Sequence, residues 1–293
     1  MRRTAALVLL LACAACGADP APSSSDGAPA SSTSSASSSA ALRTGPPVPP
    51  VDGISAEVVE NRTDRAAGRQ VQVEVGDTGE EPFSVTSVAI DSPGFVPLPA
   101  VPVTASFVPG RLIDLPTPYG EPVCDTAAEP AAARLTVVRP DGSVQELRVP
   151  MDAAALALVH GRLCAAVGVA EVVTVQVVDL VEEPDSVTGR LLLTRAGSDD
   201  RPVTVTRVEG NVLYFADAPL PLELAAGADE ASVELTFTTA RCDPHALADV
   251  KQPYLMPLSV SVDGGAEVPV DLPLDDAQRE LLRLLTVRVC TPS

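Results

Sequence analysis

Aromatic and basic residues are scarce in this chain of 293 residues, and each shortage argues against a class of function. There is no tryptophan, and phenylalanine and tyrosine number only five and three. Sugar-binding sandwiches and single-strand nucleic-acid binders commonly stack their ligands on aromatic rings, so both kinds of site are disfavoured. Acidic residues outnumber basic ones by 39 to 20 and give a net charge of -19, which repels phosphate backbones. We therefore expect no nucleic acid among the partners.

Histidine is also rare, which limits acid-base chemistry. His160 and His245 are the only two in the sequence. The chain contains no Gly-x-Ser-x-Gly elbow, P-loop, His-Glu-x-x-His or Gly-x-Gly-x-x-Gly motif. Hydrolysis or group transfer needs an activated nucleophile, a metal or two carboxylates tuned to different pKa values. The sequence therefore predicts a protein that is not an enzyme and uses no cofactor.

The N-terminus is typical of an export signal, predicted over residues 1–15. Two arginines precede an apolar run at residues 5–12, which is far too short to span a bilayer, and small residues follow it. A cysteine after such a run resembles the lipobox of bacterial lipoproteins, in which the thiol receives a diacylglyceryl group. We favour Cys16, which follows two alanines, over Cys13, which leaves a shorter apolar run. The remaining interpretation is an ordinary secretory signal cleaved nearby.

Residues 16–51 are predicted to be the lipidated cysteine and a disordered tether. From Gly17 to Pro50 nearly every residue is Ser, Thr, Ala, Pro or Gly, and this composition cannot offset its ordering entropy by burying apolar surface. Such a chain has an r.m.s. reach of roughly 30 Å. We therefore predict an exported protein that its lipid holds at the outer face of the cytoplasmic membrane. The membrane is thus an expected partner, contacted through the N-terminal lipid anchor.

Short strand-like runs replace the tether in the rest of the chain. Runs such as 71–75, 84–88 and 203–208 are rich in valine and bounded by Gly, Pro and Asp, which is typical of an all-β sandwich. One series of landmarks then occurs twice: Gly-Arg, a strand, Pro, another strand, Cys-Asp, an Asp-Gly turn, Pro-Met-Asp or Pro-Leu-Asp, a helical stretch and a cysteine. We predict two tandem immunoglobulin-like β-sandwich domains from an internal duplication, over residues 52–168 and 169–293.

Each predicted domain contains two cysteines at matched positions. Because an exported protein meets an oxidising environment, we expect Cys124 to pair with Cys164 and Cys242 to pair with Cys290. Each bridge would tie a short closing helix, which follows an Asp that can serve as N-cap, to its own sandwich. The two closing helices are predicted over residues 153–159 and 276–285.

The stretch Arg-Cys-Asp-Pro-His-Ala at residues 241–246 is followed by a hairpin and by a helix that ends in a cysteine. Over residues 236–290 this pattern resembles a group of uncharacterised exported lipoproteins of high-GC Gram-positive bacteria. That group has no assigned activity, so the resemblance implies an exported location and no catalytic residue. The first copy of the motif keeps its Cys-Asp pair and lacks the histidine.

The same motif supplies the candidates for a metal site. Asp243, His245 and Asp249 are one imidazole and two carboxylates close in sequence, a set that can bind a divalent cation. In the structural interpretation, which we prefer, Asp243 caps the loop or helix after the cysteine and His245 packs against the disulfide. The sequence therefore favours a non-catalytic interaction module that binds an envelope protein or a small ligand. A metal-dependent enzyme or accessory protein using Asp243 and His245, and a passive spacer, are the alternatives.

Overall fold

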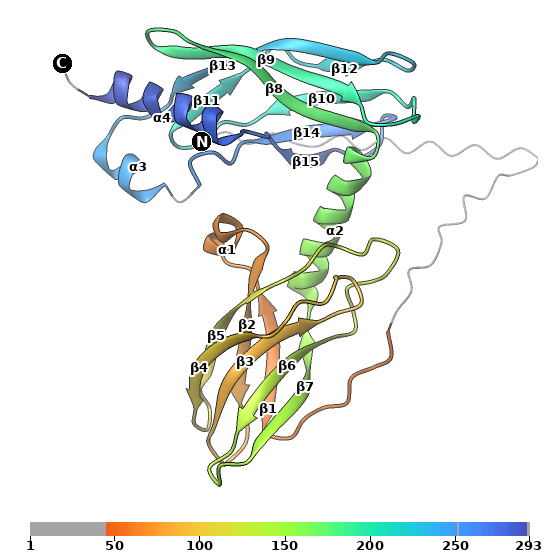
Figure 1. Ribbon diagram of the computed structural model, residues 1–293, viewed down its shortest axis with the longest axis vertical. Coiled ribbons are helices and arrows are strands. Elements are labelled where there is room, and N and C mark those ends of the chain that lie inside the picture. Colours follow the sequence, from red (N-terminus) through yellow and green to blue (C-terminus); the bar gives the residue numbers. More distant parts are fainter. Residues whose placement is uncertain (1–44, 251, 292–293) are drawn as a thin grey trace, which may run out of the picture. The chain divides into compact units, whose positions relative to one another are not determined.

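The computed structural model describes residues 45–250 and 252–291 (Figure 1). The predicted signal peptide, the lipidation candidates Cys13 and Cys16, and most of the predicted tether lie outside these residues. Strands hold 45% of the residues and helices 17%, so the fold is mostly β, as the sequence predicts. Within the described residues, no helix is both long enough and apolar enough to cross a membrane.

The N-terminal half, residues 45–170, contains one seven-stranded sheet in the order β4-β3-β6-β7-β1-β2-β5. Strand β1 runs parallel to β7, with Ala56 opposite Met151, and the other neighbouring strands are antiparallel. The predicted strands at 71–75 and 84–88 lie within β2 and β3. The elements of this half are β1 (Ile54–Val59), α1 (Arg62–Ala67), β2 (Gln70–Asp77), β3 (Phe83–Asp91), β4 (Val101–Phe107), β5 (Leu112–Pro118), β6 (Ala131–Val138), β7 (Val144–Asp152) and α2 (Ala154–Ala170).

The core of this half forms because alternate side chains of each strand face inward. Along β2 the valines at positions 71, 73 and 75 are fully buried. Phe83 stacks on Phe107 with 4.7 Å between ring centroids. Leu156 and Val159 of α2 join the same core. The first turns of α2 are therefore part of the N-terminal half.

The C-terminal half, residues 171–291, contains two four-stranded antiparallel sheets, β12-β10-β14-β15 and β11-β13-β9-β8. The predicted strand at 203–208 coincides with β10. The elements of this half are β8 (Val173–Glu182), β9 (Ser186–Arg195), β10 (Val203–Val208), β11 (Tyr214–Asp217), β12 (Leu222–Leu224), β13 (Glu230–Thr239), α3 (Pro244–Asp249), β14 (Pro257–Val262), β15 (Val268–Asp271) and α4 (Asp276–Cys290).

Strand pairing in the two halves corresponds element by element. The order β4-β3-β6-β7 is matched by β12-β10-β14-β15, and β1-β2-β5 is matched by β8-β9-β13, with β11 as an addition. The predicted Asp-Gly turns at 141–142 and 263–264 join β6 to β7 and β14 to β15. The halves differ after their first strands: the connection from β1 to β2 contains α1, whereas residues 183–185 alone connect β8 to β9.

Both closing helices are longer than the sequence predicts, since α4 runs to Cys290 and not to 285. Helix α2 continues far beyond 159, so residue 168, the predicted domain boundary, lies in its last turn. The residue before the helix is Ala153, and Asp152 ends β7, where its side chain accepts a hydrogen bond from the backbone N–H of Ala154. The predicted N-cap is therefore displaced by one residue. In α4 the predicted N-cap is correct, since Asp275 accepts from the backbone N–H of Gln278 at 2.8 Å.

Two disulfides tie the closing helices to the sheets, with the pairing that the sequence predicts. Cys124, in the loop after β5, is bonded to Cys164 in α2. Cys242, in the loop after β13, is bonded to Cys290 at the end of α4. Their Cα atoms lie 5.5 and 5.1 Å apart, within the range of ordinary disulfides. Each bridge closes a loop within its own half of the chain.

Helix α4 is also attached through a buried tyrosine. The hydroxyl of Tyr214 donates to the carbonyl of Leu282 at 2.9 Å and accepts from Thr286. Leu282 and Leu285 are fully buried in the core of the C-terminal half. The Cys242–Cys290 bridge therefore secures a helix that already packs on its sheet.

We expect the double change Cys242→Ala with Cys290→Ala to lower the free energy of unfolding by about 4 kcal/mol, because the bridge restricts a long loop of the unfolded chain. Urea unfolding without reductant measures this difference. The matched control is Cys124→Ala with Cys164→Ala, which should lose a similar amount. Unfolding of the double variant at the same urea concentration as the oxidised parent protein would contradict this role.

Candidate functional site

Of the three candidate metal ligands, the structure describes the side chains of Asp243 and His245. Asp243 forms an ion pair with Arg241 at 2.8 Å. His245, at the start of α3, is exposed, so it is not buried against the disulfide as expected. The side chain of Asp249 lies outside what the structure describes. Among the described residues, no three His, Cys, Asp or Glu side chains are grouped so that they can hold a metal ion.

The other histidine is the one that contacts a disulfide. Nε2 of His160 lies 3.5 Å from Sγ of Cys164, one helical turn further along α2, and 3.2 Å from the carbonyl oxygen of Val123. A proton on Nε2 allows the ring to donate to that carbonyl. The ring is 7% exposed and meets Phe95 edge-on. His160 is therefore a packing residue that supports the attachment of α2.

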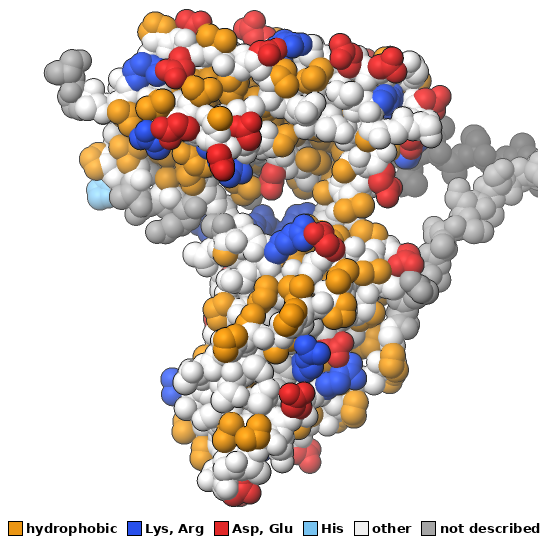
Figure 2. Space-filling model, viewed as in Figure 1, with side chains coloured by type: hydrophobic (Ala, Val, Ile, Leu, Met, Phe, Trp, Pro, Cys, Tyr) orange, Lys and Arg blue, Asp and Glu red, His pale blue; other side chains and the backbone are white. Residues whose placement is uncertain are grey.

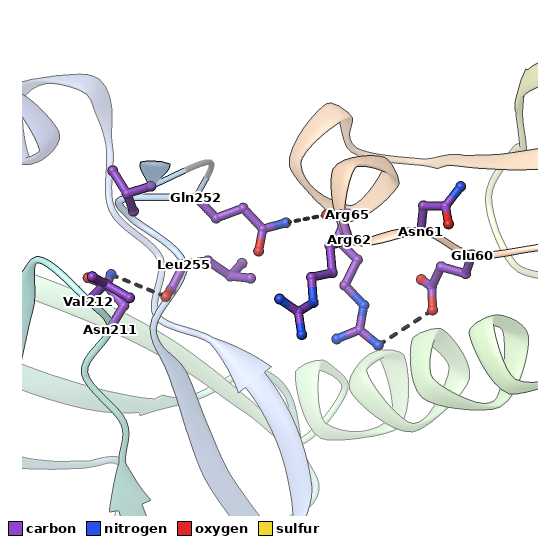
Figure 3. A pocket seen from close by; sticks show the side chains of 9 residues that line it. Glu60, Asn61, Arg62, Arg65, Asn211, Val212, Gln252 and Leu255 are labelled. Carbon is purple, nitrogen blue, oxygen red and sulfur yellow. Dashed lines mark hydrogen bonds and ion pairs between the residues drawn. The ribbon is translucent and has the colours of Figure 1, made fainter. Parts of the chain in front are cut away.

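Charged side chains from one half and apolar side chains from the other line a pocket of about 470 Å³ (Figure 3). This volume is in the usual range for small-molecule sites. Its charged side chains come from the segment that follows β1, and its apolar side chains come from the C-terminal half. The lining residues are Glu60, Asn61, Arg62, Arg65, Asn211, Val212, Val250, Gln252 and Leu255.

Helix α1 presents two arginines to this pocket because a buried carboxylate organises the turn. Asp64 is 1% exposed and accepts hydrogen bonds from the backbone N–H of Asn61 and from the side chains of Gln70 and Gln72. Residues three apart on a helix lie side by side. With Asp64 facing the protein, Arg62 and Arg65 extend together from the exposed side of α1 (Figure 3).

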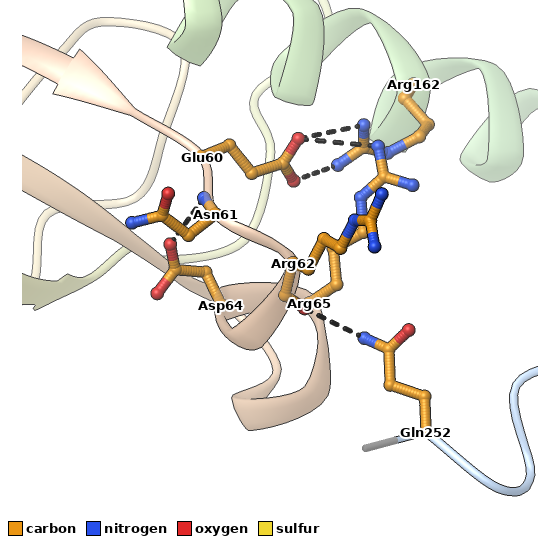
Figure 4. Close-up of polar contacts among 7 residues, drawn as sticks. All are labelled: Glu60, Asn61, Arg62, Asp64, Arg65, Arg162 and Gln252. Carbon is orange, nitrogen blue, oxygen red and sulfur yellow. Dashed lines mark hydrogen bonds and ion pairs between the residues drawn. The ribbon is translucent and has the colours of Figure 1, made fainter. Parts of the chain in front are cut away.

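A third arginine, Arg162 from α2, joins them around Glu60 (Figure 4). Nη2 of Arg162 lies 2.6 Å from Oε1 of Glu60, and Nη1 lies 3.4 Å from Oε2. Nη2 of Arg65 lies 3.4 Å from the same Oε2. Burial by itself raises the pKa of Glu60, but the hydrogen bonds and charges of Arg162 and Arg65 outweigh it, so the pKa lies below its ordinary value. Glu60 is therefore held in its ionised form.

Asp271, the last residue of β15, is influenced by the same arginines with the opposite result. Loss of hydration raises its pKa above the ordinary value, and the charges of Arg162 and Arg65 offset only part of this effect. The two carboxylates differ because Glu60 accepts hydrogen bonds from the arginines, whereas the charges act on Asp271 through space. The arginine cluster therefore stabilises one of them more than the other.

The opposite wall of the pocket is held by amide side chains. Gln252 donates from Nε2 to the backbone carbonyl of Arg62 at 3.2 Å (Figures 3 and 4). Asn211 donates to the carbonyl of Pro253 at 2.8 Å, and its Oδ1 accepts from the backbone N–H of Leu213. The side chain of Val212 remains 48% exposed beside them. The pocket thus has an arginine-rich wall and a partly apolar wall.

Sequence reasoning did not identify this cluster. One local signal exists: Asn61, a good N-cap residue, is followed by arginines at positions 62 and 65 in a chain that is otherwise acidic and contains a single lysine. Nothing near Arg162 connects it to Glu60, which is 102 residues away in sequence. The site depends on this long-range contact and is therefore invisible to motif analysis.

Comparison with known proteins identifies no family. No protein-family model matches the chain, and no curated protein matches it. Among solved structures, the transglutaminase of red sea bream overlaps 77% of this chain at 12% identity with a TM-score of 0.23. The chain spans about a third of that structure's length, 32%. An overlap at this TM-score establishes no shared fold, so the function has to be argued from the residues of this chain.

We expect Glu60→Gln to lower the free energy of unfolding at pH 7 by about 1 kcal/mol, because it removes the ion pair with Arg162. The pKa of Glu60 is lowered in the folded protein, so its contribution is present above the ordinary pKa of 4.5 and is lost as the pH falls through the folded value. Urea unfolding at pH 7 and at pH 3 should therefore show a difference from the parent protein that shrinks in acid.

Asp271→Asn is the matched control, and it should change the free energy of unfolding in the opposite direction. Because the pKa of Asp271 is raised, its ionisation lowers stability as the pH rises through the folded pKa, and removing the charge should increase stability at pH 7. A gain in stability for Glu60→Gln at pH 7, or the same loss at both pH values, would show that the arginines do not stabilise Glu60.

Proposed function

We propose that this chain is an exported, lipid-anchored protein of the cell envelope. Its folded part, two tandem immunoglobulin-like domains, acts as a non-catalytic interaction module. The basic N-terminal residues, the short apolar run and Cys16 support export and lipidation. The two disulfides support an oxidising location outside the cytoplasm.

The duplication is supported by more than strand order. Arg162 of α2 pairs with Glu60 after β1, and Arg288 of α4 pairs with Glu182 at the end of β8 at 3.0 Å. In both helices the arginine stands two residues before the bridged cysteine, as Arg-Leu-Cys and Arg-Val-Cys. A repeated ion pair from first strand to closing helix, next to a repeated disulfide, supports descent from one ancestral domain.

The observation that carries the binding role is the pocket of Figure 3. Its wall combines the guanidinium groups of Arg62 and Arg65 with apolar side chains, a combination suited to holding a ligand. The one carboxylate in it, Glu60, has a lowered pKa and two arginine partners, which makes it a weak base at neutral pH. These groups favour recognition over proton transfer.

The anchor is tested by replacing the cysteines one at a time. We expect Cys16→Ser to move the protein from the membrane fraction to the soluble or secreted fraction, because the acyl chains provide the membrane affinity. Cys13→Ser is the matched control and should leave the protein with the membrane. Fractionation of the host followed by immunoblotting measures the distribution. If neither single change nor the double change releases the protein, the proposed lipid anchor is wrong.

A further inference from the structure

Three arginines lie close together in an acidic molecule (Figure 4). The chain has a net charge of -19, yet Arg65 and Arg162 both contact the carboxylate of Glu60, and Arg62 lies beside them. On the face shown in Figure 2, acidic and basic side chains are both dispersed over the C-terminal half, and basic side chains with an acidic neighbour lie between α1 and α2. Arg65 and Arg162 are paired with Glu60, so Arg62 is the arginine of this group that has no carboxylate partner among the described residues.

The carboxylate within the cluster is already occupied. Both oxygens of Glu60 lie within hydrogen-bonding distance of Arg162, and Oε2 also faces Arg65. Arg62 forms no ion pair with any residue that the structure describes, and it lies on the Leu255 side of the pocket (Figure 3). A guanidinium group donates hydrogen bonds and accepts none. The polar group that complements this wall is therefore an acceptor with negative charge.

The amide side chains of the pocket are engaged by the protein itself. Gln252 donates to the backbone carbonyl of Arg62. Asn211 donates to the carbonyl of Pro253 and accepts from the backbone N–H groups of Leu213 and Tyr214. The remaining wall is apolar, with Val212 and Leu255 in the lining. A ligand that fits has an anionic head for the arginines and an apolar portion for this second wall.

Arg62 and Arg65 lie outside the features that the two halves share. The pair between Glu60 and Arg162 has a counterpart in the C-terminal half, so it belongs to the common scaffold. Helix α1 has none, because residues 183–185 alone connect the equivalent strands. The shared scaffold thus forms without these two side chains. Arg62 is unpaired among the described residues, and Arg65 reaches Glu60 at 3.4 Å while its side chain stays 53% exposed.

We propose that this pocket binds a small oxyanion ligand, a phosphate ester or carboxylate that carries an apolar group. The oxyanion contacts Arg62 and Arg65, whose forked donors match phosphate and carboxylate oxygens. The apolar group packs on Val212 and Leu255. This inference rests on the proposed function as an interaction module and names its class of ligand.

Isothermal titration of the full-length protein with phenyl phosphate and with phenylacetate tests this inference. We expect both to bind, and inorganic phosphate to bind more weakly than phenyl phosphate because it lacks the apolar group. Arg62→Gln should weaken binding of both probes at least tenfold with an unchanged unfolding temperature, since this side chain is exposed. Arg111→Gln is the matched control, an exposed arginine outside the pocket, and should bind like the parent protein.

The source of the oxyanion is resolved by competition. Displacement of phenyl phosphate by phosphatidylglycerol vesicles, and not by phosphatidylcholine vesicles, would identify a lipid headgroup as the source of the oxyanion. No displacement by either kind of vesicle would identify a soluble ligand. Both outcomes support the oxyanion class of ligand. Absence of binding at millimolar concentrations, or equal affinity in Arg62→Gln, would overturn the inference even in a protein anchored through Cys16. If the cysteine changes fail to release the protein from the membrane while the probes still bind, only the proposed location is overturned.

Discussion

Helix α2 is the element on which the rest of the described chain depends. Leu156 and Val159 near its start belong to the core of the N-terminal half, and Val169 near its end belongs to the core of the C-terminal half. Between them, Cys164 bonds the helix to the loop after β5. Because a helix transmits a fixed rise and rotation per residue, these attachments set the position of Arg162. The arginine cluster and the charged wall of the pocket follow from that position.

The features that the sequence predicted are those encoded by neighbouring residues. Alternating valines place β2, an Asp-Gly pair places each hairpin turn, and Asp275 begins α4. The disulfide pairing was also accessible, because four cysteines in two matched sets leave one pairing within each copy. The length of α2 was not accessible from the sequence, because the helix is apolar on nearly all sides and has no helical periodicity that marks its end. Two cores, rather than a sequence pattern, determine where it ends.

The site itself was missed because its contacts are distant in sequence. Glu60 and Arg162 are 102 residues apart, and in the sequence nothing distinguishes either one from the other charged residues. For the histidines, closeness in sequence suggested a contact with the wrong residue. His245 lies three residues from Cys242 and is exposed, whereas His160 lies one helical turn from Cys164 and contacts its sulfur. Helical geometry, not proximity in a motif, decides which histidine meets a disulfide.

The acidic surface and the arginine cluster act over different distances, and this difference selects ligands by size. At physiological salt the Debye length is about 8 Å, so charges elsewhere on the molecule are largely screened at the pocket. A small anion bound there would interact mainly with Arg62 and Arg65, which line the pocket. A polyanion such as a nucleic acid extends over the surrounding surface and meets the repulsion of a chain with net charge -19. The same sequence can therefore reject extended polyanions and still accept one compact oxyanion, provided that Glu60 remains committed to Arg162 and leaves Arg62 free to donate.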